Sequence, residues 1–503
     1  MSLAVPITQV PYHHENGLKH LNITNDYGYC ALFVVNTPVF DNSGVAHGVE
    51  HFVFRRSLAF PQSESLFQLT SLTDIKMNAS TLATITYFHC QSHCQQTFAL
   101  ALNYMLNGIL CPIFDPDDLV EEIHDGGYCG VIYRELLGAE QQVADLPSKI
   151  NPDKCSQEKY QHGGHSSIIG QLSSSDLSCF HQRFYQACDI TLITANADSA
   201  QVSHLIKQLP KKINARPENF NQQSPYDKTD NKSKYNNENN EDNKHQKKYS
   251  SEINCLIDVY HQWVKDDPQQ TINNSSKSQN RQKYSKADKK QRSPIAIDQN
   301  QNQNPKNNPG ALCKETKNSV IAQLTELSSQ LTRSRKLVYP STVPCSAPQY
   351  TLPKLFSSLY QQAQTQLTKD DNAVYIADQQ NGLLLTHINI TQQAQAHIAS
   401  FMISAYPSFL APRSQGHCYL IHASVIEQDQ YLAIYSAFDV SSATRHKHIS
   451  ESLLQLSQDL LFINESLWLA KIKYCRAHKL DIQQVCHITP ATSSKFLWAL
   501  NLL

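Results

Sequence analysis

The sequence predicts an α+β protein with two folded domains separated by a polar insert, and three observations support this prediction. Residues 1–212 and 337–503 carry apolar patterns, whereas Asn, Gln, Lys, Ser and Asp dominate between them. The segments AVYIADQQNGLLLTHINI and CYLIHASVIEQDQYLAIYSAF alternate like strands, and HISESLLQLSQDLLF has the spacing of an amphipathic helix. Strands and helices do not follow the strict βαβ order of a parallel sheet, which favours α+β.

The insert, residues 213–336, is the most polar part of the sequence. A stretch such as DKTDNKSKYNNENNEDNKHQKKYS cannot bury enough apolar surface to offset the entropy lost on ordering. We therefore expect a low-complexity insert that is mostly disordered, with one amphipathic island at 253–264. Its Asn and Gln bias also fits an assembly segment, but a plain low-complexity insertion is the better interpretation.

Composition narrows the classes of function. Among the 503 residues, 43 Lys+Arg nearly balance 44 Asp+Glu, which does not favour a nucleic-acid binder with a broad basic face. The 14 cysteines include no CxxC pair, as expected in a reducing compartment. The N-terminus lacks the features of a signal peptide, and the apolar run at 98–114 is interrupted by polar residues. We therefore expect a cytoplasmic protein with neither nucleic-acid nor membrane partners.

The motif H-x-x-E-H, formed by His47, Glu50 and His51, indicates a metal site. On a helix, residues i and i+4 lie on one face, so both imidazoles point toward one spot. Zinc accepts such nitrogen ligands at about 2.0–2.1 Å. Glu50 can then reach a metal-bound water and act as a general base. The alternative is a surface helix whose polar residues have this spacing by chance.

A catalytic zinc site usually has three protein ligands and one water, so the motif requires a third ligand. Glu135, in the segment GVIYRE, is the best candidate for this role. Glu121 and Glu122 are weaker candidates. The alternative for Glu135 is a solvated helix residue beside Arg134.

The motif and its surroundings resemble the pitrilysin/insulinase family of zinc peptidases, most of all its presequence-protease branch. SGVAHGVEH matches the start of the branch's motif, NAST at 78–81 its edge strand, and GVIYRE the helix with its third zinc ligand. The resemblance implies one zinc ion per catalytic site, held by His47, His51 and Glu135. It also implies that 1–212 is a catalytic insulinase-type domain, a mostly antiparallel sheet covered by helices.

A second match lies in the last domain. Arg413 and Tyr419, in RSQGHCY, resemble the family's Arg…Gly-x-x-Tyr pair, which reaches across to the zinc site. The resemblance implies a second insulinase-type domain at 337–503, with Tyr419 donating to the developing oxyanion and Arg413 holding a substrate carbonyl or carboxylate. His417 and Cys418 replace the usual small residues. Long members of the branch have two further domains in the middle, where this chain has its insert.

We therefore expect a zinc-dependent endopeptidase that cleaves short unstructured peptides. Asn78 and Ala79, on the expected edge strand, would bind an extended peptide through main-chain hydrogen bonds. The alternative is a catalytically inactive family member that acts as a peptide-binding or scaffold subunit. Two assemblies remain open, because Arg413 and Tyr419 could reach the zinc domain of their own chain or that of a partner in a homodimer.

Overall fold

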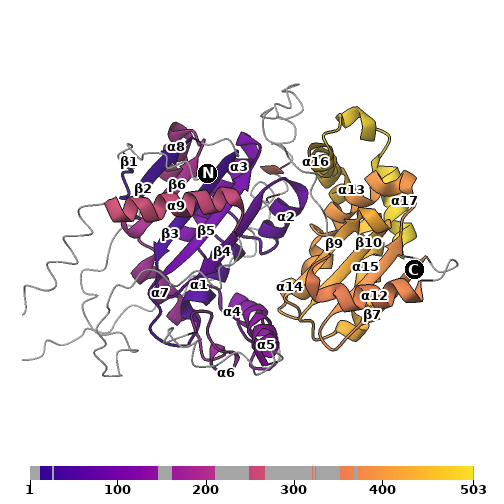
Figure 1. The fold of residues 1–503 in the computed structure, drawn as a ribbon, viewed down its shortest axis with the longest axis horizontal. Coiled ribbons are helices and arrows are strands. Elements are labelled where there is room, and N and C mark those ends of the chain that lie inside the picture. The colour runs from indigo at the N-terminus through magenta and orange to yellow at the C-terminus, as the bar shows by residue number, and fades with distance from the viewer. Residues whose placement is uncertain are drawn as a thin grey trace, which may run out of the picture.

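The computed structural model consists of two domains that lie side by side, each a sheet covered by helices (Figure 1). It describes residues 12–24, 28–127, 129–144, 161–209, 249–266, 320, 323–324, 352–367 and 372–501. The prediction of an α+β protein with two mostly antiparallel sheets is confirmed. Among the described helices, none combines the length and apolar character needed to cross a bilayer.

The first domain is built on a six-stranded sheet in the order β1-β2-β6-β3-β5-β4. All neighbouring strands are antiparallel except β2 and β6. Within the described sheet, no strand pairs with the outer side of β4, which is therefore an edge strand. The strands are β1 (Tyr12–His13), β2 (Lys19–Ile23), β3 (Tyr29–Asn36), β4 (Lys76–Thr81), β5 (Ile85–Ser92) and β6 (Ile190–Ala195).

Strand β3 is buried on both faces because its residues 30–35 are all apolar. Successive side chains of a strand point to opposite faces. Phe33 and Val35 therefore enter the larger core, whereas Leu32 and Val34 enter a smaller one on the other face. The larger core contains residues of α1 (Val45–Arg55), α2 (Ser65–Leu72), α3 (Gln95–Leu110), α7 (Ser174–Phe184) and α8 (Ser199–Gln208).

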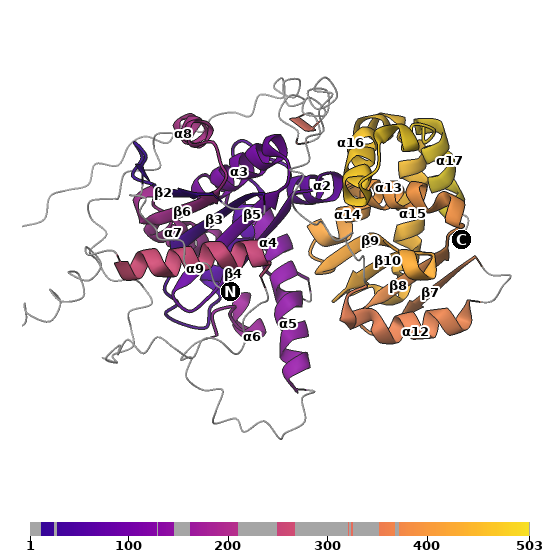
Figure 2. The same cartoon turned by 45° about the horizontal axis from the view of Figure 1, so that its top comes forward.

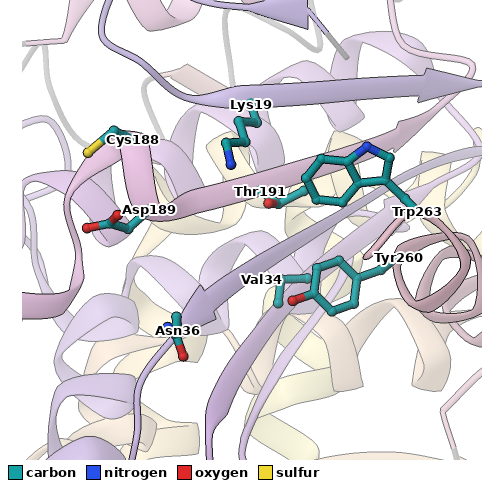
Figure 3. A pocket seen from close by; sticks show the side chains of 8 residues that line it. All are labelled: Lys19, Val34, Asn36, Cys188, Asp189, Thr191, Tyr260 and Trp263. Carbon is teal, nitrogen blue, oxygen red and sulfur yellow. The ribbon is translucent and has the colours of Figure 1, made fainter. Parts of the chain in front are cut away.

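The smaller core is closed by α9 (Ser251–Asp266), which lies across the sheet (Figure 2). Its Trp263 lies beside Lys19 of β2, with Nζ 5.7 Å from the ring centre, at a cavity of about 240 Å³ (Figure 3). The expected amphipathic island is therefore a helix that belongs to the first domain. The rest of the insert, apart from residues 249–250, 320 and 323–324, lies outside the described residues.

Three further helices lie below the first sheet (Figure 1), and the first two contribute Glu122 and Glu135 to the cavity of the site. Asp115 caps the first of them, with Pro116 at its first position. These residues favour a helix start because the capping carboxylate accepts from a free backbone N–H and proline has none to leave unpaired. The helices are α4 (Pro116–Glu122), α5 (Val131–Ala144) and α6 (Ser166–Ile169).

The second domain has a four-stranded antiparallel sheet in the order β7-β8-β10-β9. Its strands are β7 (Ala373–Ala377), β8 (Gly382–His387), β9 (Leu420–Ile426) and β10 (Tyr431–Ala437). The turn between β9 and β10 contains η7 (Glu427–Asp429). The helices are α12 (Ser357–Gln366), α13 (Gln393–Ile403), α14 (Pro407–Ser414), α15 (Arg445–Gln458), α16 (Leu460–His478) and α17 (Pro490–Asn501).

Direct hydrogen bonds join the two domains near α2 and α16. Lys473 Nζ donates to the carbonyl oxygens of Thr70 and Ser71, at 2.8 and 2.9 Å. The hydroxyl of Ser71 donates to the carbonyl of Ser404 at 3.1 Å. The second domain of the chain therefore packs on the first domain of the same chain.

Candidate metal centre

His47, His51 and Glu135 come together from two helices, α1 and α5. Glu135 Oε2 lies 3.6 Å from His47 Nε2 and 3.5 Å from His51 Nε2. One ligand atom from each residue lies within 4.8 Å of the others. Ligand atoms around a tetrahedral zinc with bonds of about 2.1 Å are about 3.4 Å apart. The spacing of these three groups therefore fits one metal ion.

The hydrogen bonds of the two histidines leave the nitrogens that face Glu135 free of protons in their neutral forms. The carbonyl of Gly163 lies 2.9 Å from His47 Nδ1, and Glu122 Oε1 lies 2.7 Å from His51 Nδ1. Both oxygens are acceptors, so each Nδ1 is the donor and each Nε2 keeps its lone pair. Glu135 Oε2 is buried without a hydrogen bond of its own. Three acceptor atoms thus converge on one point, and these residues fit a cation.

Electrostatics at this point also favour a positive charge. Burial lowers the pKa of His51, but its bonds with Glu122 and Glu135 outweigh burial and raise it to about 9. Burial raises the pKa of Glu135, yet the two histidines hold it well below its usual value. The surroundings therefore favour a positive charge at this point, which a divalent cation would supply.

Glu122, a weaker sequence candidate for the third ligand, instead orients His51. Besides its bond with His51 Nδ1, it accepts from Arg55 Nη1 at 2.7 Å and lies 3.2 Å from Arg413 Nη2. Burial raises the pKa of Glu122, but Arg413, His51 and Arg55 together bring it far below its usual value. Glu121, the other weaker candidate, pairs with Arg55. Both carboxylates therefore contact groups other than the histidine Nε2 atoms.

Glu50 and Tyr419 lie next to this group, one from each domain. Glu50, on α1, is 7% exposed, and its Oε2 accepts a hydrogen bond from Thr81 of the edge strand at 2.5 Å. Tyr419 lies directly before β9, and the negative charge of Glu135, together with burial, raises its pKa. Tyr419 therefore keeps its hydroxyl proton and is available as a donor.

A cavity of about 230 Å³ is lined by all the residues that the sequence favoured for the site, whereas Glu121, a weaker candidate ligand, is not among its lining residues. From the first domain come the three candidate ligands, Glu50, and the edge-strand residues Asn78 and Ala79; from the second come Arg413 and Tyr419. Arg413 was expected to bind substrate, and its guanidinium is here held by Glu122 and lies over the ring of Phe67. The structure thus gives Arg413 a protein partner in this cavity.

Gly416 lets the second domain approach closely enough to place Arg413 and Tyr419. Its carbonyl accepts a hydrogen bond from the Gly130 N–H, just before α5, at 2.9 Å. Its φ of +70° lies in the left-handed region, and a Cβ there would be 2.3 Å from the Glu121 carbonyl oxygen. Glycine is therefore required by both conformation and space.

Sequence reasoning missed three groups that position the site. They are the carbonyl of Gly163 at His47, the hydroxyl of Thr81 at Glu50, and Glu122 in its role at His51. Thr81 lies within NAST, whose resemblance to the edge strand of the peptidases was the available signal. Nothing in the spacing of Glu122 indicates which histidine nitrogen it faces.

Comparisons with known proteins show that part of the chain is similar to proteases. No family model matches the chain. Presequence proteases of Eremothecium gossypii and Saccharomyces cerevisiae are each 26% identical to it, over 198 and 209 residues. Over about a third of its length, the chain is similar to presequence proteases. These alignments cover 36% of this chain and 20% of each relative.

Two other similarities add little to this relation. An uncharacterized protein of Schizosaccharomyces pombe is 26% identical over 171 residues, 32% of this chain and 16% of its own. Among solved structures, the periplasmic protease PqqL from Escherichia coli aligns with 98% of the chain and 46% of its own, at 12% identity and a TM-score of 0.32, too low to carry an argument. The chain spans about a fifth of the length of the curated relatives it matches.

Proposed function

We propose that this chain is a zinc-dependent endopeptidase that cleaves short, unstructured peptides. The observation that carries the proposal is the convergence of three acceptor atoms, from His47, His51 and Glu135, in a cavity that also contains Glu50. Two histidines and one carboxylate are a ligand set of catalytic zinc, which keeps a fourth position open. The similarity to presequence proteases supports peptides as the substrate.

The zinc ion, when bound, lowers the pKa of a water to about 7 and polarises the peptide carbonyl. Glu50 takes the proton of the attacking water and delivers it to the leaving amine. Its Oε2 is occupied by Thr81, which holds the carboxylate in place and leaves Oε1 for the proton. Tyr419, which keeps its own proton, donates to the oxyanion that develops on the carbonyl.

The edge strand indicates how a peptide would lie. Asn78 and Ala79 of β4 line the cavity, and the outer side of β4 is not paired within the described sheet. An extended peptide that adds to this edge would bind mainly through its backbone, so selection by sequence would be weak. An unstructured peptide can adopt this extended form without first unfolding, which favours short unstructured peptides as substrates.

One chain would form a complete site. Arg413 and Tyr419 line the cavity next to the candidate ligands of their own chain, so an exchange of domains between two chains is not needed. We therefore propose that the monomer is active, and that dilution leaves its activity per chain unchanged. Activity that falls on dilution would support the homodimer instead.

The test is Glu50→Gln, measured with a set of quenched fluorescent peptides and with zinc analysis of the same samples. We expect wild type to cleave peptides, a chelator to stop it, and Glu50→Gln to retain zinc while losing cleavage. Glu451→Gln, on the exposed side of α15, is the matched control and should cleave like wild type. Cleavage by Glu50→Gln would overturn the proposed role. A wild type that binds zinc and peptides without cleavage would support the inactive, peptide-binding alternative.

A further inference from the structure

A second group of two histidines and one glutamate lies in the second domain. His397 is on α13, Glu427 is in the turn between β9 and β10, and His478 is the last residue of α16. Glu427 Oε1 lies 2.9 Å from His397 Nε2 and 3.5 Å from His478 Nε2. One ligand atom from each residue lies within 4.8 Å of the others. The 3.5 Å distance matches the separation of about 3.4 Å between the ligands of a tetrahedral zinc, and the 2.9 Å distance is shorter by about 0.5 Å.

The packing of α13 against α16 brings the two imidazoles together. Tyr474 lies one turn before His478, and its ring centre is 4.3 Å from that of His478 and 5.5 Å from that of His397. The two histidine rings are themselves 5.2 Å apart. The tyrosine therefore flanks both imidazoles and limits their rotation, so their Nε2 atoms stay directed at the same carboxylate.

Both imidazoles are largely shielded from solvent. The His397 side chain is 1% exposed and that of His478 is 17% exposed. Two largely buried rings thus lie beside one carboxylate, and imidazole is the commonest metal ligand among side chains.

One polar atom of Glu427 and one of His478 resemble Glu135 Oε2 of the first site. Glu427 Oε1 and His478 Nε2 are buried, and neither has a hydrogen bond in the part of the chain that the structure describes. Burying such atoms without partners costs free energy. Glu135 Oε2 has the same deficit at the first site. A cation among the three side chains would remove it.

From this geometry we infer that His397, Glu427 and His478 form a second metal site, which takes a divalent transition-metal ion with zinc as the best match. Imidazole nitrogen together with one carboxylate oxygen suits zinc better than calcium or magnesium, which prefer oxygen ligands. The Glu427 side chain is 35% exposed, so solvent can reach the ion and supply a fourth ligand. This inference does not depend on the peptidase proposal.

The position of the site indicates a stabilising role. A metal ion there would join α13, the β9–β10 turn and the end of α16, which are distant in the sequence. Lys473, five residues before His478, makes hydrogen bonds to the first domain, and Arg476 lies 3.8 Å from Asp74. The ion would therefore hold the end of α16 at the place where the two domains meet.

The first test counts zinc ions in the full-length protein after chelation, reconstitution and desalting. We expect two per chain in wild type and one in each of His478→Gln, Glu427→Gln and the double variant His47→Ala/His51→Ala. His487→Gln, exposed and in the same domain, is the control for loosely held zinc and should keep two. Because zinc retained at the first site reports a folded first domain, a loss of one ion from His478→Gln is not confused with unfolding.

The second test uses the melting temperature. In the His47→Ala/His51→Ala variant only the second site remains, so zinc should raise the melting temperature of this variant but not that of its combination with His478→Gln. A single zinc ion in wild type, with no change in His478→Gln, would overturn the inference. So would a melting temperature of His47→Ala/His51→Ala that does not respond to zinc. The group would then be a hydrogen-bonded tether without metal.

Discussion

The two domains contain strands and helices in the same order, but these elements carry different side chains. In the first domain, β3 is followed by α1, α2 and the antiparallel pair β4–β5; in the second, β8 is followed by α13, α14 and β9–β10. The strand orders β3-β5-β4 and β8-β10-β9 are the same. Helices α1 and α13 therefore have equivalent places in the two domains.

The equivalent helices carry different side chains. On α1, His47 and Glu50 are 8% and 7% exposed, and both face the cavity. On α13, the buried residues are mostly apolar, and His397 lies near one end of the sheet. Buried polar groups need partners, which Glu135 and Glu122 supply to the histidines of α1 and Thr81 supplies to Glu50. The second domain adds to the cavity through the end of α14 and the start of β9 instead.

Among the substitutions that test this difference between the domains, Glu135→Gln should have the largest effect on zinc binding and on cleavage. Loss of one of three candidate ligands should reduce zinc affinity by more than the 10–100-fold typical of a residue that only orients a ligand. Cleavage should fall with it, and one zinc should remain at the second site. Zinc titration followed by a peptide assay measures both. Normal zinc content would mean that Glu135 does not bind the metal.

Tyr419→Phe should slow turnover by on the order of 10²-fold or more, as expected for loss of one donor to an oxyanion. Zinc content should stay at the wild-type level, because the hydroxyl is not among the candidate ligands. Tyr431→Phe, on β10 of the same domain, is the matched control and should leave kcat unchanged. A wild-type kcat in Tyr419→Phe would contradict the contribution of the second domain to the site.

Glu122→Gln should weaken zinc binding at the first site by about 10–100-fold. The amide cannot hold the His51 N–H as strongly as a carboxylate, and it also loses its ion pairs with Arg55 and Arg413. Glu121→Gln is the neighbouring control, since Glu121 contacts Arg55 but not His51. Equal zinc affinity in the two variants would show that Glu122 does not orient the ligand.

Gly416→Ala should have the smallest effect of these substitutions. It should lower the free energy of unfolding and weaken the contact between the two domains at this residue. A left-handed alanine costs about 1–2 kcal/mol, and its Cβ would also clash with the Glu121 carbonyl. Gly126→Ala has the same type of strain, at φ +83°, but no atom within 4 Å of its Cβ. Urea denaturation should therefore show a larger loss for Gly416→Ala. Equal losses would mean that close packing at Gly416 contributes nothing.

The α9 helix shows where sequence reasoning reached its limit in the fold. The periodicity at 253–264 predicted an amphipathic segment, and the structure places a helix over those residues. Periodicity indicates that one face of a helix is apolar, but it does not indicate which part of the protein packs against that face. The signal for that surface was in β3, whose continuous apolar residues 30–35 require a cover on both sides of the sheet.

The sequence by itself determined what depends on local spacing. His47 and His51 share a helical face because they are four residues apart, and the apolar alternation of 382–387 and 431–437 marks two strands. The resemblance to the peptidase family extended the predicted site to Glu135, Arg413 and Tyr419. Only the tertiary structure decided that these residues line one cavity, that Glu122 holds His51, and that three further residues from α13, α16 and a turn meet in the second domain. The physical reason is that convergence over long sequence distances is set by packing and close approach, as at Gly416, which no local pattern encodes.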